Sequence, residues 1–234
     1  MSSPSFPGRL AARLGLAAVL ILAILVAACE LPGQVTTIGV GPYTVGSGVV
    51  TTEARTLPDF HAVSAGEGVT VTVRQGSLGV SVTAEDNLID HVTTEVRDGT
   101  LVVDVAGSIQ THEPLAVTAT APTLDGLSAS TGATIDTEDL DADTLRVVAS
   151  TGASLRAGGR AGSLDLAADT GATADLRNLT ATTATVEVTT GSTAHVSVSD
   201  RVSGACTGGS TLHVHGTPAS VDVTTDAASS VQRD

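Results

Sequence analysis

From residue 55 onward, apolar and polar residues alternate along the chain with a period of two. This period is typical of β-strands that bury one face, because successive side chains of a strand point to opposite sides. The dipeptides Gln75-Gly76 and Asp98-Gly99 interrupt the alternation and predict turns. A helical turn is expected only at 84–90. The runs that predict strands are 69–73, 80–82, 92–96, 101–105 and 115–120.

The second half of the chain repeats a glycine step, rich in Thr and Ser, five times. A fixed period of this length is typical of a solenoid, in which each repeat forms one coil and contacts only its neighbours. Glycine suits such a turn because it adopts a positive φ without steric cost. A β-sandwich with ordinary turns is the alternative, and it accounts less well for the constant spacing. The repeated glycines, with steps of 20, 19, 20 and 18, are Gly132, Gly152, Gly171, Gly191 and Gly209.

Aligning the repeats on these glycines separates apolar columns from polar ones. Because side chains alternate, the apolar columns predict the interior of an all-β, single-stranded, right-handed parallel β-helix with coils of about 18–20 residues. Cys206 lies in an interior column and is expected to be a buried, unreactive thiol. The interior columns are Ile135, Leu155, Ala174, Ala194 and Leu212; Ala129, Ala149, Ala168, Val188 and Cys206; and Leu127, Val147, Leu166, Val186 and Gly204.

One polar column carries most of the chemistry in the repeats. Four residues after each glycine lie Asp136, Arg156, Asp175, His195 and His213. The first three predict a surface charge ladder, which contributes little stability per pair. The imidazoles of His195, His213 and the nearby His215 are also the candidate ligands for zinc or copper. The simpler interpretation is a solvated, Thr-rich face, and we expect no metal, no cofactor and no catalytic residue.

The first part of the predicted domain carries a series of motifs that resembles a known family. Together with the glycine repeats, the series is similar to the bacterial family of exported proteins called "putative auto-transporter adhesin head GIN domain". The resemblance covers residues 55–231. It implies a single-stranded parallel β-helix, an exported location and an adhesin-like role. The motifs are Arg55-x-Leu57-x-x-Phe60-x-x-Val63, Val69-x-Val71-x-Val73-x-x-Gly76, Asn87-Leu88, Val92 and Gly99-Thr-Leu101-x-Val103.

The N-terminus predicts export and a lipid anchor. A short polar segment with Arg9 and Arg13 precedes fifteen uncharged apolar residues, 14–28, and this run ends in Val-Ala-Ala-Cys. Such a segment describes a secretory signal and is short for a membrane span. The ending resembles the bacterial lipobox, in which Cys29 becomes the acylated N-terminus. An uncleaved membrane anchor is the alternative. We therefore expect a lipoprotein signal peptide at 1–28 and a lipid anchor with a flexible tether at 29–54. The β-helix follows at 55–231, with a tail at 232–234.

Charge and composition exclude one class of partner. The chain has 11 Arg and no Lys against 25 acids, for a net charge of −14. Without residues 1–28, which include Arg9 and Arg13, 9 Arg face 25 acids and the net charge is −16. This field repels phosphate backbones, and the remaining aromatics are only Tyr43 and Phe60. Nucleic acid is therefore not an expected partner.

These features favour a non-enzymatic, lipid-anchored protein of the cell surface or envelope. In this hypothesis the chain is held at the membrane through its N-terminal lipid, faces the extracytoplasmic side and displays an adhesin-like β-helix to an unknown extracellular protein or glycan. A self-assembling envelope scaffold is the alternative, although the degenerate last coil, with Asp226 in place of a glycine, looks like a cap. A polysaccharide-active enzyme is less favoured, because paired acids and an aromatic platform are missing.

Overall fold

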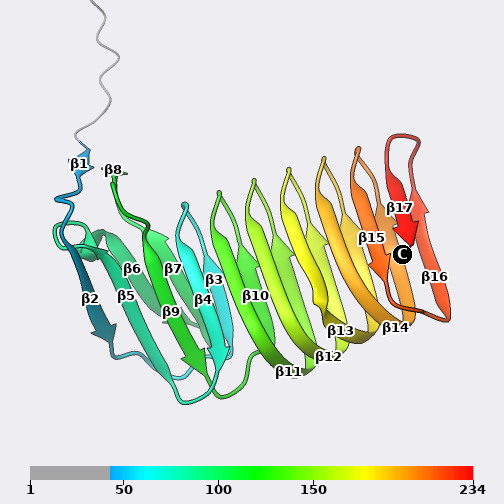
Figure 1. The fold of residues 1–234 in the computed structure, drawn as a ribbon, viewed down its shortest axis with the longest axis horizontal. Coiled ribbons are helices and arrows are strands. Elements are labelled where there is room, and N and C mark those ends of the chain that lie inside the picture. The colour runs from blue at the N-terminus through cyan, green and yellow to red at the C-terminus, as the bar shows by residue number, and fades with distance from the viewer. Residues whose placement is uncertain (1–42, 234) are drawn as a thin grey trace, which may run out of the picture. The chain divides into compact units, whose positions relative to one another are not determined.

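The computed structural model describes residues 43–233, which form strands and one short 3-10 turn, η1 (Ile89–His91) (Figure 1). The signal peptide and Cys29 predicted above lie outside this range. None of the helices in residues 43–233 has the length and apolar character to cross a membrane. The strands are β1 (Thr44–Val45), β2 (Val50–Arg55), β3 (Ala62–Ala65), β4 (Thr70–Gln75), β5 (Gly79–Glu85), β6 (Val92–Arg97), β7 (Thr100–Val105), β8 (Ile109–Gln110), β9 (Ala116–Ala121), β10 (Gly126–Ala129), β11 (Thr134–Ala149), β12 (Ser154–Ala168), β13 (Thr173–Val188), β14 (Thr193–Cys206), β15 (Thr211–His215), β16 (Ser220–Thr225) and β17 (Ser230–Arg233).

The domain is a parallel β-solenoid, as the repeat predicted. The strands β11 to β14 are long, and each bends once and returns, so that its first half joins one row of paired strands and its second half another (Figure 1). We call these rows sheet 1 and sheet 2. Sheet 1 runs β2-β5-β9-β4-β11-β12-β13-β14-β15-β17. Sheet 2 runs β6-β7-β3-β10-β11-β12-β13-β14-β16.

Successive coils are joined by one repeated turn, which leads from sheet 2 to sheet 1. In the turn at 130–133, the Ala133 N–H donates to the Ser130 carbonyl at 3.0 Å, and Thr131 and Gly132 between them both have positive φ. This is the geometry of a type I′ turn. The Gly132 N–H donates to the Thr151 carbonyl of the next turn at 3.1 Å, so the turns are also linked to one another. The same pattern explains why glycine recurs once per coil.

The core consists of the columns that the alignment placed inside. Ile135, Leu155, Ala174, Ala194 and Leu212 have no exposed surface, and Cys206 is a buried free thiol. Gly204 is the exception, because a Cβ there would lie 1.9 Å from the Val186 carbonyl oxygen. The interior is filled mainly by Leu, Val and Ala from both sheets, which explains how coils with so few aromatic residues pack.

The N-terminal part of the domain departs from the regular coil. The pairs β2–β5, β5–β9 and β6–β7 are antiparallel. The predicted turn at Asp98-Gly99 joins β6 to β7, with Arg97 opposite Thr100. The helical turn expected at 84–90 is partly wrong: Ala84 and Glu85 belong to β5, and η1 overlaps the expected range only at Ile89 and Asp90. Strand β1 and all but the last residue of β2 lie in the segment expected as a tether, so the folded part begins earlier than residue 55. Residues 29–42 lie outside the described range.

The last coil closes the other end of the solenoid. Asp226 accepts hydrogen bonds from the N–H groups of Gly208 (2.7 Å) and Ala228 (3.1 Å). The Ser229 hydroxyl accepts from Gly209 at 3.0 Å and from Ser210 at 3.1 Å. In the earlier coils the N–H of the turn glycine donates to a carbonyl of the next turn, and at Gly209 the Ser229 hydroxyl takes the place of that carbonyl. That the last coil caps the solenoid stays a prediction.

Candidate functional site

The polar column lies on the outer side of sheet 1, in the register that the alignment gave. Asp136 pairs with Arg156, Arg156 with Asp175, Asp175 with His195, and His195 with His213. Neighbouring coils therefore place these five side chains on one line across β11 to β15. All five are at least partly exposed, while the residues on either side of each are buried in the core.

A second row of outward residues runs beside this column and consists almost entirely of hydroxyls. It crosses the whole of sheet 1, from β2 to β17, and Ala116 is its one member without a hydroxyl. Strand pairing aligns the row at the spacing of neighbouring strands, about 4.8 Å. The column and the row together give sheet 1 a regular polar face. The row is Thr52, Thr83, Ala116, Thr70, Thr134, Ser154, Thr173, Thr193, Thr211 and Ser230.

The charged residues of the column lie in line, as the predicted surface charge ladder requires, but Asp175 forms its ion pair outside the column. Asp175 binds Arg177 on its own strand, with 2.7 Å between the Arg177 Nε and the Asp175 Oδ1. Burial raises the pKa of Asp175, but hydrogen bonds from the Arg177 side chain and backbone outweigh burial and bring the pKa below its usual value. None of the ion pairs within residues 43–233 joins Arg156 to Asp136 or Asp175. Arg177 is closer because residues two apart on a strand share a face.

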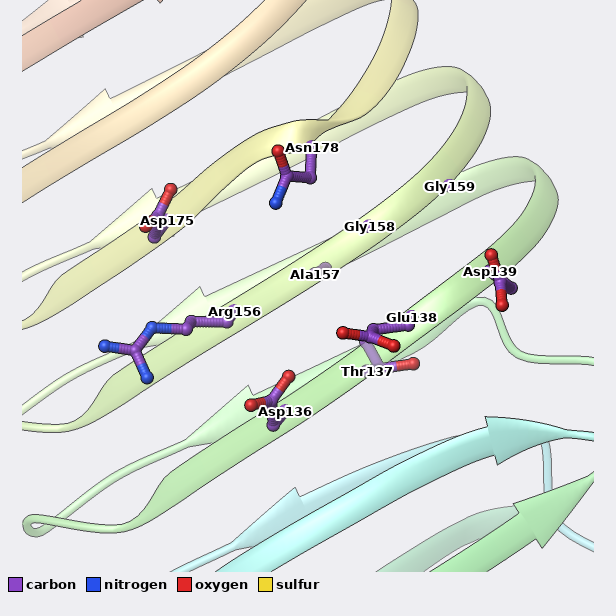
Figure 2. A pocket seen from close by; sticks show the side chains of 10 residues that line it. All are labelled: Asp136, Thr137, Glu138, Asp139, Arg156, Ala157, Gly158, Gly159, Asp175 and Asn178. Carbon is purple, nitrogen blue, oxygen red and sulfur yellow. The ribbon is translucent and has the colours of Figure 1, made fainter.

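A shallow hollow of about 330 Å³ lies beside this part of the column (Figure 2). Its polar lining includes Glu138, Asp139 and Asn178, which the alignment did not single out. The hollow forms where the pairing of β11 with β12 shifts register, next to Asp139 with its positive φ of 58°. Gly159 is required there, because a Cβ would lie 2.1 Å from the Leu140 carbonyl oxygen. The sequence signal for this irregularity is the Gly158-Gly159 pair.

The three histidines meet at the C-terminal end of the column. The rings of His195 and His213 stack with centroids 4.3 Å apart and planes 6° apart. The Nδ1 of His195 lies 3.2 Å from the Nε2 of His215. Burial lowers the pKa of His195, and the charges of His213 and Arg177 lower it further. The imidazole rings are therefore stacked, and a positive charge on His195 is unfavourable because the ring is partly buried beside His213 and Arg177.

The zinc or copper site considered from the sequence stays a prediction that the structure does not test. Among the residues that the structure describes, no group of three or more His, Cys, Asp and Glu side chains could hold a metal ion. The His195 and His213 rings lie one above the other because their backbones are neighbours in register. What the outer side of sheet 1 offers is a row of hydroxyls beside carboxylates, a guanidinium and imidazoles.

Comparison with known proteins gives the family. Three similar crystal structures show the same fold, and because their sequence identities are low they are evidence for the fold alone. A "putative adhesin" from Bacteroides fragilis NCTC 9343 has a TM-score of 0.67 and 15% identity, with 81% of this chain and 99% of that chain covered. A "putative adhesin" from Parabacteroides merdae ATCC 43184 has a TM-score of 0.55 and 16% identity, with 83% and 100% covered. A "putative lipid binding protein" from Parabacteroides distasonis ATCC 8503 has a TM-score of 0.50 and 14% identity, with 82% and 100% covered.

A search of curated proteins found no significant match. The family model described as "Putative auto-transporter adhesin, head GIN domain" matches residues 59–218, which is more than half of the chain. The match begins just before β3 and ends between β15 and β16, so it includes the whole polar column. On this evidence the chain belongs to the family described as "Putative auto-transporter adhesin, head GIN domain".

Proposed function

We propose that the protein is a lipid-anchored, non-enzymatic adhesin whose binding surface is the outer side of sheet 1. Membership of this family indicates a protein of the cell surface or envelope. The family model and two of the three similar structures carry the description "putative adhesin", and the third is called a "putative lipid binding protein". Attachment through Cys29, the absence of catalysis and the location of the binding surface are our proposals. The ligand class that fits best is an extracellular glycan or protein with many hydroxyl or amide groups.

One observation carries this proposal: the hydroxyl row is in register across the ten strands of sheet 1, and the polar column runs beside it across five of them. Hydroxyl, carboxylate, guanidinium and imidazole groups at one regular spacing can donate to and accept from an extended polar ligand. Each hydrogen bond is worth little alone, so a rigid array that makes many of them at once is favoured over a flexible one. A β-solenoid provides this rigidity because each coil is fixed by its two neighbours.

The same surface is poorly suited to the enzymatic alternative. Sugar-cleaving sites generally combine two carboxyl groups in a cleft with aromatic side chains. Of the two aromatic residues after the signal peptide, Phe60 is buried in the core and Tyr43 lies before the first coil. The scaffold alternative is weakened by the last coil, where Asp226 and Ser229 occupy the turn N–H groups of Gly208 and Gly209.

Binding to purified envelope polymers tests the proposal. The variant Arg156→Thr/His195→Thr/His213→Thr places Thr on a face that is already rich in Thr and removes the guanidinium and two imidazoles of the column. We expect it to bind bacterial cells and envelope polysaccharide less than the wild type. The control is Arg146→Thr/Asp165→Thr, which removes an exposed ion pair from sheet 2. Equal loss in both variants, or no loss in either, contradicts the assignment of the binding surface to sheet 1.

The lipid anchor has its own test. Cys29→Ser removes the residue that we expect to be acylated, and labelled palmitate is expected to enter the wild type and not the variant. A Cys206→Ser control separates the two cysteines, because Cys206 is buried and unavailable for acylation. Palmitate labelling and not membrane retention is the measurement, because the variant also loses the expected cleavage site and keeps the apolar residues 14–28. A wild type that stays in the membrane without label would support an uncleaved anchor instead.

A further inference from the structure

Large apolar side chains are exposed almost only where the described chain begins. Tyr43, Val45, Val49 and Val50 are 51%, 45%, 59% and 49% exposed. Among residues 43–233, Leu78 at 39% is the one other large hydrophobic residue with high exposure. We call residues 43–50 the entry segment. Concentrated exposed apolar surface commonly marks a contact with another molecule or with a membrane.

The entry segment is held in place by a buried carboxylate. Glu85 at the end of β5 has no exposed surface, and its Oε1 accepts from the Gly48 N–H at 2.7 Å. Its Oε2 accepts from the His112 N–H at 3.1 Å. Gly46 leaves the space that this carboxylate occupies, because a Cβ on residue 46 would lie 2.0 Å from Oε2. The segment therefore wraps closely around Glu85.

The two residues after Glu85 fix the rest of the segment. The Asn87 amide donates to the Val45 carbonyl at 2.7 Å and accepts from the Ser47 N–H at 2.9 Å. The Asp86 N–H donates to the Val49 carbonyl at 2.8 Å. Strand β1 also pairs with β8. An ordered backbone therefore keeps the valine side chains exposed to solvent. None of these hydrogen bonds requires an apolar side chain at those positions, so the apolar character needs another explanation.

We propose that the entry segment rests on the outer surface of the lipid bilayer to which the chain is anchored. The proposal depends on the proposed anchor at Cys29. Thirteen residues, 30–42, separate Cys29 from Tyr43, and even fully extended they span at most about 50 Å. The bilayer is therefore the apolar phase that is always within reach of this segment. Tyrosine and valine are suited to the interface between headgroups and acyl chains.

The net charge of the chain indicates which interactions can hold the entry segment at the bilayer. The chain after residue 28 has 9 Arg and 25 acids, so anionic lipids repel it. The contact must then depend on apolar burial and on the lipid anchor, not on basic residues. It is expected to persist, or to strengthen, as salt screens the repulsion. A second copy of the chain is the competing occupant, and the test below separates the two.

Tyr43 supplies the test, because the chain has one Tyr and no Trp. The full-length lipidated protein is reconstituted into phosphatidylcholine vesicles, with and without bromine atoms near the top of the acyl chains. Bromine quenches fluorescence only at short range, so we expect loss of Tyr43 emission in the brominated vesicles. The Val49→Ser/Val50→Ser variant is expected to lose this quenching. Leu78→Ser, an exposed apolar residue at the other end of β5, is expected to keep it.

Vesicle flotation in the same samples distinguishes the outcomes. A chain that does not float contradicts the lipid anchor and, with it, the bilayer contact. A chain that floats without bromine quenching leaves the anchor in place and overturns only the contact of the entry segment. An emission change that follows the protein-to-lipid ratio but not bromine identifies a second copy as the occupant, which also overturns the proposal.

Discussion

The regular coils and the N-terminal part of the domain are stabilised in different ways. From β11 to β14, strands of 14 to 16 residues repeat one coil, and outside the register shifts the strands pair with the same positions of the next copy. Between residues 43 and 125 the strands have two to seven residues, three pairs are antiparallel, and a buried carboxylate fixes the connections. One hydrophobic core runs through both parts, and the N-terminal part adds single contacts that occur once.

The largest effect is expected from the shared core of the coils. Leu155 lies in the centre of an interior column and has no exposed surface. Leu155→Ala is expected to lower the free energy of unfolding by about 2–5 kcal/mol, because it leaves a cavity between coils that cannot collapse. Urea unfolding measures the loss, and Leu78→Ala, at an exposed position, is the control. An effect as small as that of the control would mean that the coils are less tightly packed than the columns indicate.

A change at Glu85 is expected to act locally. Glu85→Gln removes the charge that accepts the Gly48 and His112 N–H groups. Burial raises the pKa of Glu85, but these hydrogen bonds outweigh it and the pKa lies below its usual value. Hydrogen exchange should therefore become faster in peptides from 43–50 and 108–113 and stay unchanged in the coils. The exposed Glu187 on β13 gives the control, Glu187→Gln. Faster exchange throughout the coils would contradict the comparison.

The histidine stack introduces a dependence on pH into the coils. The pKa of His195 is lowered by burial and then by the charges of His213 and Arg177, so the folded state binds the proton less tightly than the unfolded chain. Stability is therefore highest above the unfolded pKa of about 6.5 and falls as the pH drops below it. Melting temperatures between pH 7.5 and 5 measure this loss.

His195→Thr is the matched variant, because Thr is already common on this face of sheet 1. Its melting temperature should change less over the same pH range than that of the wild type. The lowered pKa values of Glu85 and Asp226 add a separate loss. That loss begins only as the pH falls below about 4.5 and continues through the folded pKa values. If the melting temperature falls equally with pH in wild type and variant above pH 5, protonation of His195 does not destabilise the folded chain.

The sequence predicted what repeats and missed what occurs once. The interior columns could be read because Ile135, Leu155 and Leu212 recur at a fixed distance from a glycine, and burial follows the period of a strand. The role of Glu85 could not be read, because its partners Gly48 and His112 lie 37 and 27 residues away and no copy of the contact exists. In the sequence, Glu85 cannot be distinguished from any other acidic residue at the end of a predicted strand.

The polar column shows the same limit within the repeats. Strand alignment gives the register of backbone positions, so Asp136 to His213 were correctly placed on one line. It does not give the direction of long side chains. Asp175 therefore binds Arg177 instead of Arg156, and the imidazole rings of His195 and His213 stack. The hollow beside Glu138 and Asn178 was missed because it depends on a register shift.

The repeated turn gives the smallest effect and the sharpest question. Thr131, Thr151, Thr170 and Thr190 all have φ of 50° to 56°, a region that β-branched residues rarely adopt. Left-handed backbone costs such residues about 1–2 kcal/mol, and Asn tolerates it better. Thr151→Asn is therefore expected to raise the free energy of unfolding by about 0.5 kcal/mol, since part of that strain is relieved. Thr173→Asn, in the regular strand β13, should lower it, because Asn is disfavoured in strands.

The value of this variant lies in measuring stability and binding together. Four strained threonines in successive turns are not explained by stability, because a better residue for the turn is available at each of them. If Thr151→Asn raises stability and leaves binding to envelope polymers unchanged, the strain has no role in binding. If it raises stability and weakens binding, the turns extend the binding surface from sheet 1 onto the adjoining edge. A loss of stability would instead show that neighbouring threonines stabilise one another across the linked turns.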